Sequence, residues 1–168
     1  KNSAGIDFGN QAQLQILLDN VAPFAAKPIP KIADNNIENL NAAISAAKKY
    51  FPTWAATSAN ERAKILENCA DLLEKNSHEL IALCVREAGK TLQDSVAEIR
   101  EAADFCRYYA AEARRIMQPD FLPSPTGESN IITLHPHGVF ACISPWNFPL
   151  AIFIGQVAAA LATGNCVI

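Results

Sequence analysis

The chain has 168 residues, of which 50% are hydrophobic, and its 14 basic and 17 acidic side chains leave a net charge of −3 at pH 7. This length allows one packed domain or part of a larger one. Balanced charge without a basic stripe argues against a nucleic-acid surface. The longest apolar run, residues 148–162, is shorter than the roughly 20 residues that span a bilayer, so we predict no membrane span.

The cysteines indicate a reducing environment. There are five, far apart in apolar stretches, and no Cys-x-x-Cys or cysteine–histidine spacing typical of zinc ligands occurs, so we predict no metal site. An odd number of thiols without a secretory signal favours the cytoplasm. Two histidines flank Pro136, but no carboxylate or thiolate lies nearby in sequence, and we interpret residues 135–137 as a surface turn. The first residue is not methionine and the last lies in an apparent strand, so we expect a piece of a longer protein.

Residues 1–36 are interpreted as an N-terminal segment and linker, with one short helix over 14–21 and a proline-containing linker over 22–36. Residues 37–128 are interpreted as a helical part, whose first helix runs over 37–50 and ends before Pro52. Two pairs of residues have the spacing of capping boxes and predict two more helix starts: Ser58 with Glu61, and Asn76 with Glu79.

The longest periodic segment, residues 91–117, predicts a helix with a buried apolar stripe. The stripe consists of Leu92, Val96, Ile99, Ala103, Cys106, Ala110, Ala113 and Met117. A second stripe contains Glu98, which has Asp94 four residues before it, Glu101 three after it and no basic residue at helical contact spacing. This pattern fits a solvated face that tolerates weak repulsion. A cation from outside the helix would relieve the repulsion.

The remaining residues, 129–168, are interpreted as a strand, a turn and a βαβ unit. A loop is predicted over 118–129 and a strand over 130–135. Residues 139–143 are short and apolar, which fits a strand buried on both faces. An apolar core helix follows over 150–162 and a second strand over 166–168, which together predict a helix-rich α/β fold.

The ends of this core helix carry local signals. Pro149 suits the first helical position, and Gly164 suits the left-handed residue that ends a helix. Asn147 follows the first strand, where ligands bind in open parallel sheets. Its amide oxygen can cap the helix, or its NH2 can face outward beside the positive end of the helix and stabilise an oxyanion.

Three motifs carry a resemblance to a known family: Pro136-x-Gly138-Val139, Ile143-Ser144-Pro145-Trp146-Asn147-Phe148-Pro149 and Ala160-Leu161-Ala162-x-Gly164-Asn165. Together they resemble the start of the cofactor domain in the aldehyde dehydrogenase superfamily. With Gly127-Glu128-Ser129-Asn130 and the run from Ile143 to Gln156, the chain is most similar to the L-glutamate γ-semialdehyde (1-pyrroline-5-carboxylate) dehydrogenase domain of bifunctional proline utilization A (PutA) proteins.

The resemblance implies NAD-dependent oxidation of L-glutamate γ-semialdehyde to glutamate in proline catabolism, by a fold of which this chain is the truncated N-terminal part. Asn147 matches the family's oxyanion donor, and four preceding residues match the segment that lies along NAD: Ile143, Ser144, Pro145 and Trp146. Glu98 matches the acid near the α-ammonium of the substrate, an amino-acid aldehyde. Phe148 matches the aromatic residue that packs on the substrate's aliphatic chain.

The resemblance also implies a homo-oligomer, because the strand at 130–135 matches the family's oligomerisation arm. A proline dehydrogenase domain with FAD, and a DNA-binding region, are implied only outside this chain. No cysteine here matches the family's nucleophile, so we expect the segment alone to be inactive. Two alternatives stay open: another aldehyde oxidiser of the superfamily, or a non-catalytic helical oligomerisation module whose stripe over 92–117 meets another chain.

Overall fold

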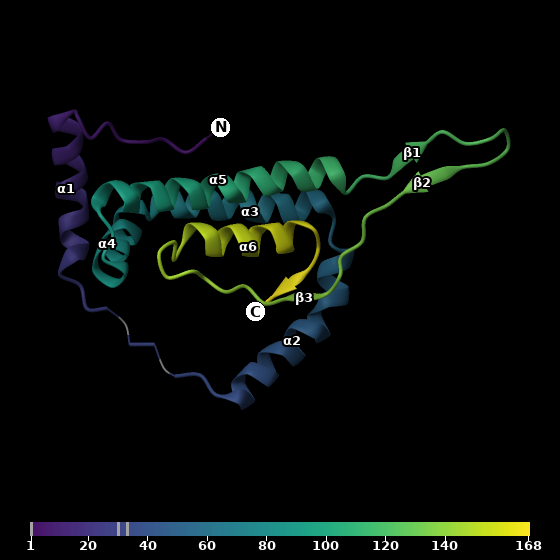
Figure 1. Ribbon diagram of the computed structural model, residues 1–168, viewed down its shortest axis with the longest axis horizontal. Helices are drawn as coiled ribbons and strands as arrows, with labels where there is room; N and C mark the ends of the chain where they lie inside the picture. The colour runs from purple at the N-terminus through teal and green to yellow at the C-terminus, as the bar shows by residue number, and fades with distance from the viewer. Residues whose placement is uncertain (1, 30, 33) are drawn as a thin grey trace.

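The computed structural model describes residues 2–29, 31–32 and 34–168, and Figure 1 labels its elements in chain order. The helices are α1 Gln11–Ala25, α2 Ile37–Ala56, α3 Ala59–Lys75, α4 Ser77–Ala88, α5 Leu92–Ile116 and α6 Ala151–Ala162. The strands are β1 Asp120–Leu122, β2 Asn130–Ile132, β3 Val139–Phe140 and β4 Cys166–Val167. The predicted helix-rich α/β fold is confirmed. The part of the predicted linker at Pro30 and Ala33 lies outside the described residues.

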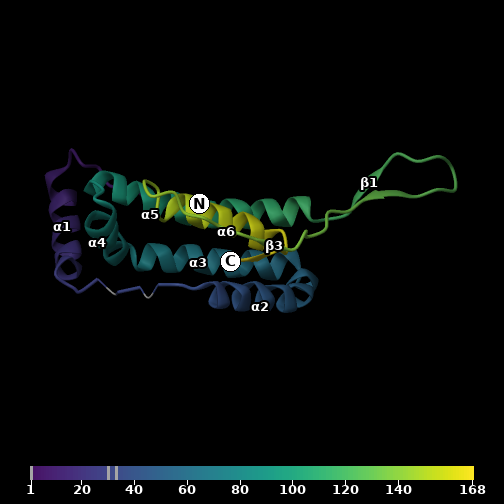
Figure 2. The ribbon, with the colours of Figure 1, turned by 60° about the horizontal axis from the view of Figure 1, so that its bottom comes forward.

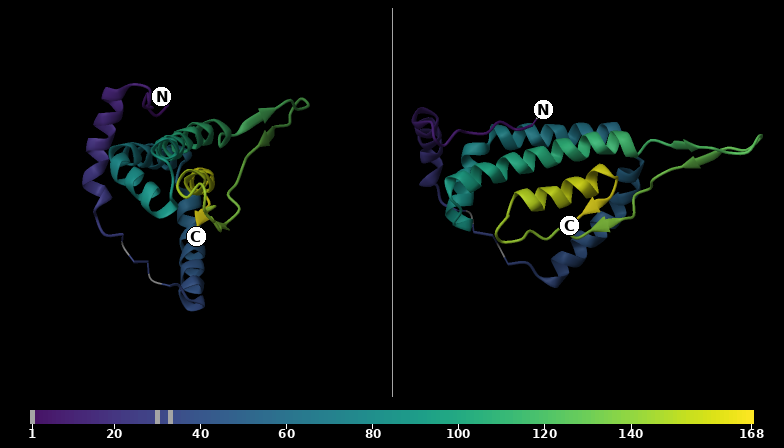
Figure 3. Two further views of the ribbon diagram at one scale, coloured as in Figure 1. Left: turned by 60° about the vertical axis from the view of Figure 1, so that its left-hand side comes forward. Right: turned by 45° about the horizontal axis from the view of Figure 1, so that its top comes forward.

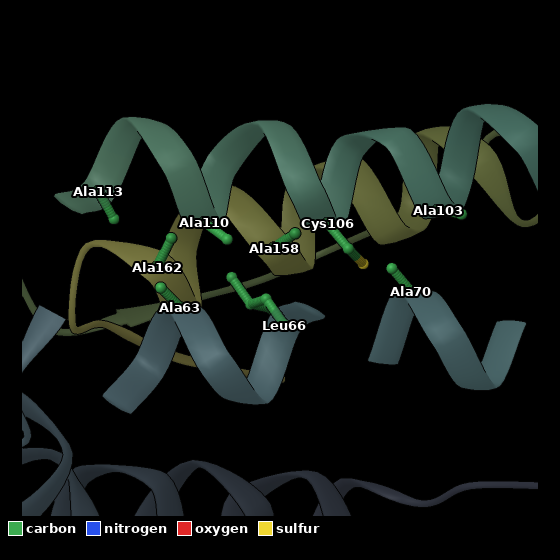
Figure 4. Close-up of a cluster of buried hydrophobic side chains, with 9 residues drawn as sticks. All are labelled: Ala63, Leu66, Ala70, Ala103, Cys106, Ala110, Ala113, Ala158 and Ala162. Atoms are coloured by element: carbon green, nitrogen blue, oxygen red, sulfur yellow. The ribbon is translucent and has the colours of Figure 1, made fainter. Parts of the chain in front are cut away.

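The centre of the fold is a layer of three helices, α3, α5 and α6, which lie side by side in Figures 1 and 3. Figure 4 shows that mostly small side chains fill the space between them: Ala63, Leu66, Ala70, Ala103, Cys106, Ala110, Ala113, Ala158 and Ala162. Small contact residues let helix axes approach closely. Gly155 belongs to the same pattern, because a Cβ there would lie 3.1 Å from the Phe105 ring.

The predicted stripe of α5 is therefore buried inside the chain, from Val96 to Ala113. Its partners in the same chain are α1 and α4 at Val96 and Ile99, and α3 and α6 from Ala103 to Ala113. The alternative in which this stripe meets another chain is wrong, because the surface that it needs is already covered.

A second buried cluster joins α1, α4 and the first turns of α5, at the left of Figure 1. Its members are Leu17, Val21, Ile81, Ala82, Cys84, Val96 and Ile99. The predicted short helix is present as α1 but runs on to Ala25 with Pro23 inside it, so the linker prediction is wrong for residues 22–25. Phe24 packs on this cluster, and its burial stabilises the additional turn.

The second helix, α2, also continues through a proline. The predicted end before Pro52 is wrong, since α2 runs to Ala56. The indole Nε1 of Trp54 donates a hydrogen bond to the carbonyl oxygen of Leu161 at 3.2 Å and fixes the last turn of α2 on the end of α6. This tertiary contact outweighs the local preference of a chain to leave the helix before proline.

One of the two predicted capping boxes is present. Ser58 and Glu61 exchange the expected hydrogen bonds at the start of α3. At α4 the predicted helix start is confirmed but the capping box is absent, because Asn76 directly joins two helices and has φ −99° and ψ 16° instead of an extended backbone. Its Nδ2 donates to the Leu72 carbonyl at 2.8 Å, and Glu79 pairs with Lys27 at 3.2 Å.

The predicted βαβ unit is confirmed. β3 and β4 pair in parallel, with Val139 opposite Cys166, and α6 connects them. Gly164, with φ 88°, follows the end of α6 as expected. The first strand is shorter than the predicted 139–143 and is not buried on both faces, since Phe140 is 42% exposed. Among the described residues β3 has one neighbouring strand, which leaves its other edge open.

An antiparallel pair of short strands, β1 and β2, forms an arm that points away from the helices in Figures 1 and 2. Phe121 lies opposite Ile131 in this pair. The predicted loop over 118–129 is thus wrong for β1, and the strand predicted over 130–135 ends at Ile132. None of the helices in the described ranges combines the length and apolar character needed to cross a membrane.

Candidate active site

The turn between β3 and α6, residues 141–150, carries most of the predicted site residues. Its start is fixed to α6, because the Ile143 N–H donates to Gln156 Oε1 at 2.9 Å and the Ile143 carbonyl accepts from Gln156 Nε2 at 3.2 Å. Gln156 thus explains the single polar position in an otherwise apolar helix. The Ser144 hydroxyl donates to the Pro149 carbonyl at 2.9 Å, so this carbonyl points back into the turn.

The helix begins later than the sequence predicts. Ala151 is the first residue of α6, so Pro149 lies in the preceding turn and is not its first helical residue. No side chain at Leu150 caps α6, and Asn147 lies three residues earlier. The capping role for Asn147 is therefore wrong. The N–H groups of Leu150 and Ala151 donate instead to Glu98 Oε2, at 3.2 and 2.8 Å, so α5 supplies the cap of α6.

Glu98 is buried, with its side chain 1% exposed. Its Oε1 accepts a hydrogen bond from Lys90 Nζ at 2.8 Å, while Oε2 accepts from the start of α6. A negative charge is favoured at a helix N-terminus, where the helix dipole is positive. The interpretation of Glu98 as part of a solvated face is wrong, and the cation that compensates it comes from the same chain.

Lys90 contacts three of the predicted site residues and was missed by the sequence analysis. It lies in the connection between α4 and α5, eight residues before Glu98 and beyond helical contact spacing. Its Nζ also donates to the Asn147 backbone carbonyl at 2.8 Å and lies 4.6 Å from the centre of the Phe148 ring. The one available signal was Glu98 itself, a carboxylate with two acidic neighbours that needed a cation from elsewhere.

The other end of α6 is held by a buried cation. The Arg62 side chain of α3 is 3% exposed, and its Nε donates to the Ala162 carbonyl at 3.0 Å while Nη1 donates to the Thr57 carbonyl. Burial lowers the pKa of the Arg62 guanidinium. A positive charge suits the negative end of a helix, so both ends of α6 meet a buried charge of complementary sign.

The predicted site residues of the turn are mostly exposed, whereas Glu98 is buried under the start of α6. Ile143 is 78% exposed, Trp146 84% and Phe148 39%, and Ser144 and Asn147 are also exposed, while Pro145 is partly buried. The structure records no hydrogen bond to the Asn147 side chain from the described residues. The turn thus exposes the Asn147 carboxamide next in sequence to Phe148 and Trp146, and the ion pair of Lys90 and Glu98 is buried under it.

The five cysteines are all free thiols. Burial raises the pKa of Cys84 to about 11, and it also raises the pKa of Cys142 and of Cys166. The pKa of Cys106 is raised by its hydrogen bond with Cys69 and by burial. These four groups stay protonated at neutral pH, which makes them poor nucleophiles.

The fold agrees with the sequence comparison. The profile of the aldehyde dehydrogenase family matches residues 10–168, and the chain belongs to that family. It is 38% identical to the bifunctional protein PutA of Salmonella typhimurium, over 99% of this chain and 14% of that protein. The chain therefore spans about one seventh of this curated relative.

Solved structures give the same result. A variant of proline utilization A (PutA) from Bradyrhizobium japonicum is 50% identical, with a TM-score of 0.92 over 99% of this chain and 17% of that one. A 1-pyrroline-5-carboxylate dehydrogenase from Thermus, solved with bound NAD, is 28% identical, with a TM-score of 0.86 over 99% of this chain and 38% of that one.

Proposed function

We propose that this chain is part of an NAD-dependent dehydrogenase that oxidises L-glutamate γ-semialdehyde to glutamate in proline catabolism. Family membership supports oxidation of an aldehyde, and the similarity to PutA and 1-pyrroline-5-carboxylate dehydrogenases supports this substrate. One structural observation carries the proposal. The Asn147 carboxamide is exposed at the carboxyl end of β3, and its main chain is fixed from below by Lys90.

Asn147 is proposed as the oxyanion donor. In the reaction a cysteine thiolate adds to the aldehyde carbon, and the carbonyl oxygen becomes negatively charged. A donor that is already in place when this charge forms stabilises the transition state without further reorganisation. None of the five cysteines of this chain matches the family's nucleophile, so we propose that the thiolate comes from another part of the protein.

Residues 143–146, most of which are exposed, are proposed to contact a nicotinamide cofactor. When bound, NAD supplies the acceptor for the hydride that leaves the tetrahedral adduct. Helix N-termini often bind phosphate, but the first N–H groups of α6 already donate to Glu98. We therefore propose that Ile143, Ser144, Pro145 and Trp146 would hold NAD, and that the start of α6 would not supply N–H donors to its phosphates.

Phe148 and Glu98 are proposed to shape the substrate end of the site. The partly exposed Phe148 ring provides an apolar surface for the short aliphatic chain of an amino-acid aldehyde. Direct pairing of Glu98 with the substrate ammonium would require the surface above it to open, since the Glu98 side chain is 1% exposed and lies beneath the turn that it caps. We therefore propose that Glu98 acts on the substrate indirectly, through the turn that carries Phe148.

Assembly and location complete the proposal. The exposed arm of β1 and β2 is proposed to join subunits of a homo-oligomer, because its facing side chains Phe121 and Ile131 are 72% and 45% exposed. The free thiols support a cytoplasmic location. FAD, and any contact with DNA, are assigned to regions outside this chain.

The proposed function is tested with Asn147→Ala in a protein that contains this chain together with the region that bears the nucleophilic cysteine. We expect kcat for NAD reduction with L-glutamate γ-semialdehyde to fall by roughly 10²- to 10³-fold, the usual effect of losing an oxyanion donor. An unchanged kcat would rule out this role. The purified 168-residue chain alone is expected to give no NAD reduction.

A further inference from the structure

We propose that Lys90 is a positioning residue, which holds the Asn147 peptide so that the carboxamide is in place when the oxyanion forms. This inference rests on the proposed function of Asn147. It starts from one ammonium group with three neighbours. Lys90 Nζ lies 2.8 Å from Glu98 Oε1, 2.8 Å from the Asn147 carbonyl oxygen and 4.6 Å from the centre of the Phe148 ring.

The contact with the Asn147 carbonyl matters because the side chain of this residue has no support of its own. The Asn147 side chain is exposed and receives no hydrogen bond from the described residues. The Asn147 carbonyl and the Phe148 N–H belong to one planar peptide, and this N–H donates to the Pro145 carbonyl at 3.2 Å. The Lys90 bond holds the carbonyl side of the same peptide, so the two bonds together fix the direction in which the Asn147 side chain leaves the main chain.

Lys90 is itself held firmly, which a positioning residue requires. Its side chain is 11% exposed, and its charge is balanced by the buried carboxylate of Glu98. Glu98 is in turn bonded to the first N–H groups of α6. The start of α6 and the Asn147 peptide are therefore connected to one ion pair, whose basic member comes from the α4–α5 connection and whose acidic member comes from α5.

The Phe148 ring adds a second constraint on the same turn. A cation 4.6 Å from a ring centre is attracted to the ring face. The ammonium thus contacts two consecutive residues of the turn, one through its main chain and one through its side chain. A neutral side chain of the same length would keep the packing of the stem but lose both contacts.

The test is a double-mutant cycle of Lys90→Met and Asn147→Ala, in a protein that contains this chain and the nucleophile-bearing region. Because a misplacement of about 1 Å in an active site can cost 10²-fold, we expect Lys90→Met to lower kcat by roughly 10- to 100-fold. KM for NAD should change less than about twofold. In the Asn147→Ala background, where no carboxamide is left to position, Lys90→Met should change kcat by less than about twofold.

Two results would overturn the inference. One is a normal kcat for Lys90→Met while Asn147→Ala is impaired, which leaves the proposed function intact. The other is an equal loss from Lys90→Met in both backgrounds, which would mean that Lys90 acts independently of Asn147. A normal kcat for Asn147→Ala would instead remove the oxyanion role itself, so the two failures are distinguishable.

Two further variants keep the test interpretable. Lys64→Met serves as the matched control, because Lys64 is an exposed lysine on α3, away from the turn, and its kcat should equal that of the parent protein. If Lys90→Met alone does not fold because Glu98 is left unpaired, Lys90→Met combined with Glu98→Gln removes both charges. The Asn147 carbonyl is still unsupported in this variant, so its kcat should be lowered by the same 10- to 100-fold factor.

Discussion

At the scale of single residues, the site depends on a carboxylate that never reaches the surface. Glu98 caps α6 with one oxygen and pairs with Lys90 through the other. Breaking a buried pair by removing one partner typically costs about 3–5 kcal/mol, because the other charge is left uncompensated. The residue therefore contributes to stability and to the geometry of the turn at the same time.

This dual role predicts the kinetics of Glu98→Gln. An indirect role changes the turn for every substrate, so we expect kcat/KM to fall by a similar factor for L-glutamate γ-semialdehyde and for a simple aliphatic aldehyde. The measurement is steady-state NAD reduction with both substrates, and Glu101→Gln, an exposed neighbour on α5, is the control. A rise of KM confined to the amino-acid aldehyde would show direct ammonium binding instead.

At the scale of secondary structure, α6 depends on its neighbours for both ends. Its sequence is apolar apart from Gln156, and its N-terminus has no side-chain cap of its own. At its C-terminus the Thr163 hydroxyl donates to the carbonyls of Ala159 and Ala160. Glu98 of α5 covers the N-terminus, and Arg62 of α3 covers the C-terminus. A helix with such an apolar sequence is stable only when buried, so burial and capping are supplied by the same two helices.

Arg62→Met is predicted to destabilise the protein. It removes the charged donors to the carbonyls of Ala162 and Thr57, and loss of hydrogen bonds from a charged group costs about 1.5–3 kcal/mol each. We expect the free energy of unfolding, measured with denaturant, to fall by about 3–6 kcal/mol. Arg115→Met, at an arginine whose side chain is 70% exposed, is the control and should change stability by less than about 1 kcal/mol. Equal effects would contradict the capping role.

At the scale of the whole molecule, the sequence predicted which residues are buried and in what order the elements follow. It predicted the ends of the helices and the contacts between distant residues less well. The α5 stripe, the Ser58–Glu61 box and the βαβ order follow from local periodicity and were confirmed. The C-terminus of α2 and the start of α6 were not, because they depend on contacts across more than 50 residues. Lys90 was missed for the same reason, since its carbonyl partner on Asn147 lies 57 residues away.

The arm gives a prediction for the assembly. Replacing the facing pair Phe121 and Ile131 by serine removes exposed apolar side chains that no described residue covers, so the fold should persist while subunits dissociate. Sedimentation velocity of a protein that contains this chain should show a smaller species than the parent. Glu128→Gln, at a polar exposed site on the arm, should leave the mass unchanged. An unaltered mass for the serine variant would remove the arm from the interface.

Because both ends of α6 are held by other helices, the movements of three helices are coupled. Glu98 and Arg62 come from different helices, so α3 holds one end of the crossover and α5 the other. Sliding of α3 along α5 would therefore stretch or tilt α6, and the carboxyl end of β3, which the turn joins to α6, would move with it. The three helices, packed on alanine side chains, therefore move as one rigid unit. A substitution that disturbs their packing would also displace the Asn147 carboxamide at the end of the sheet.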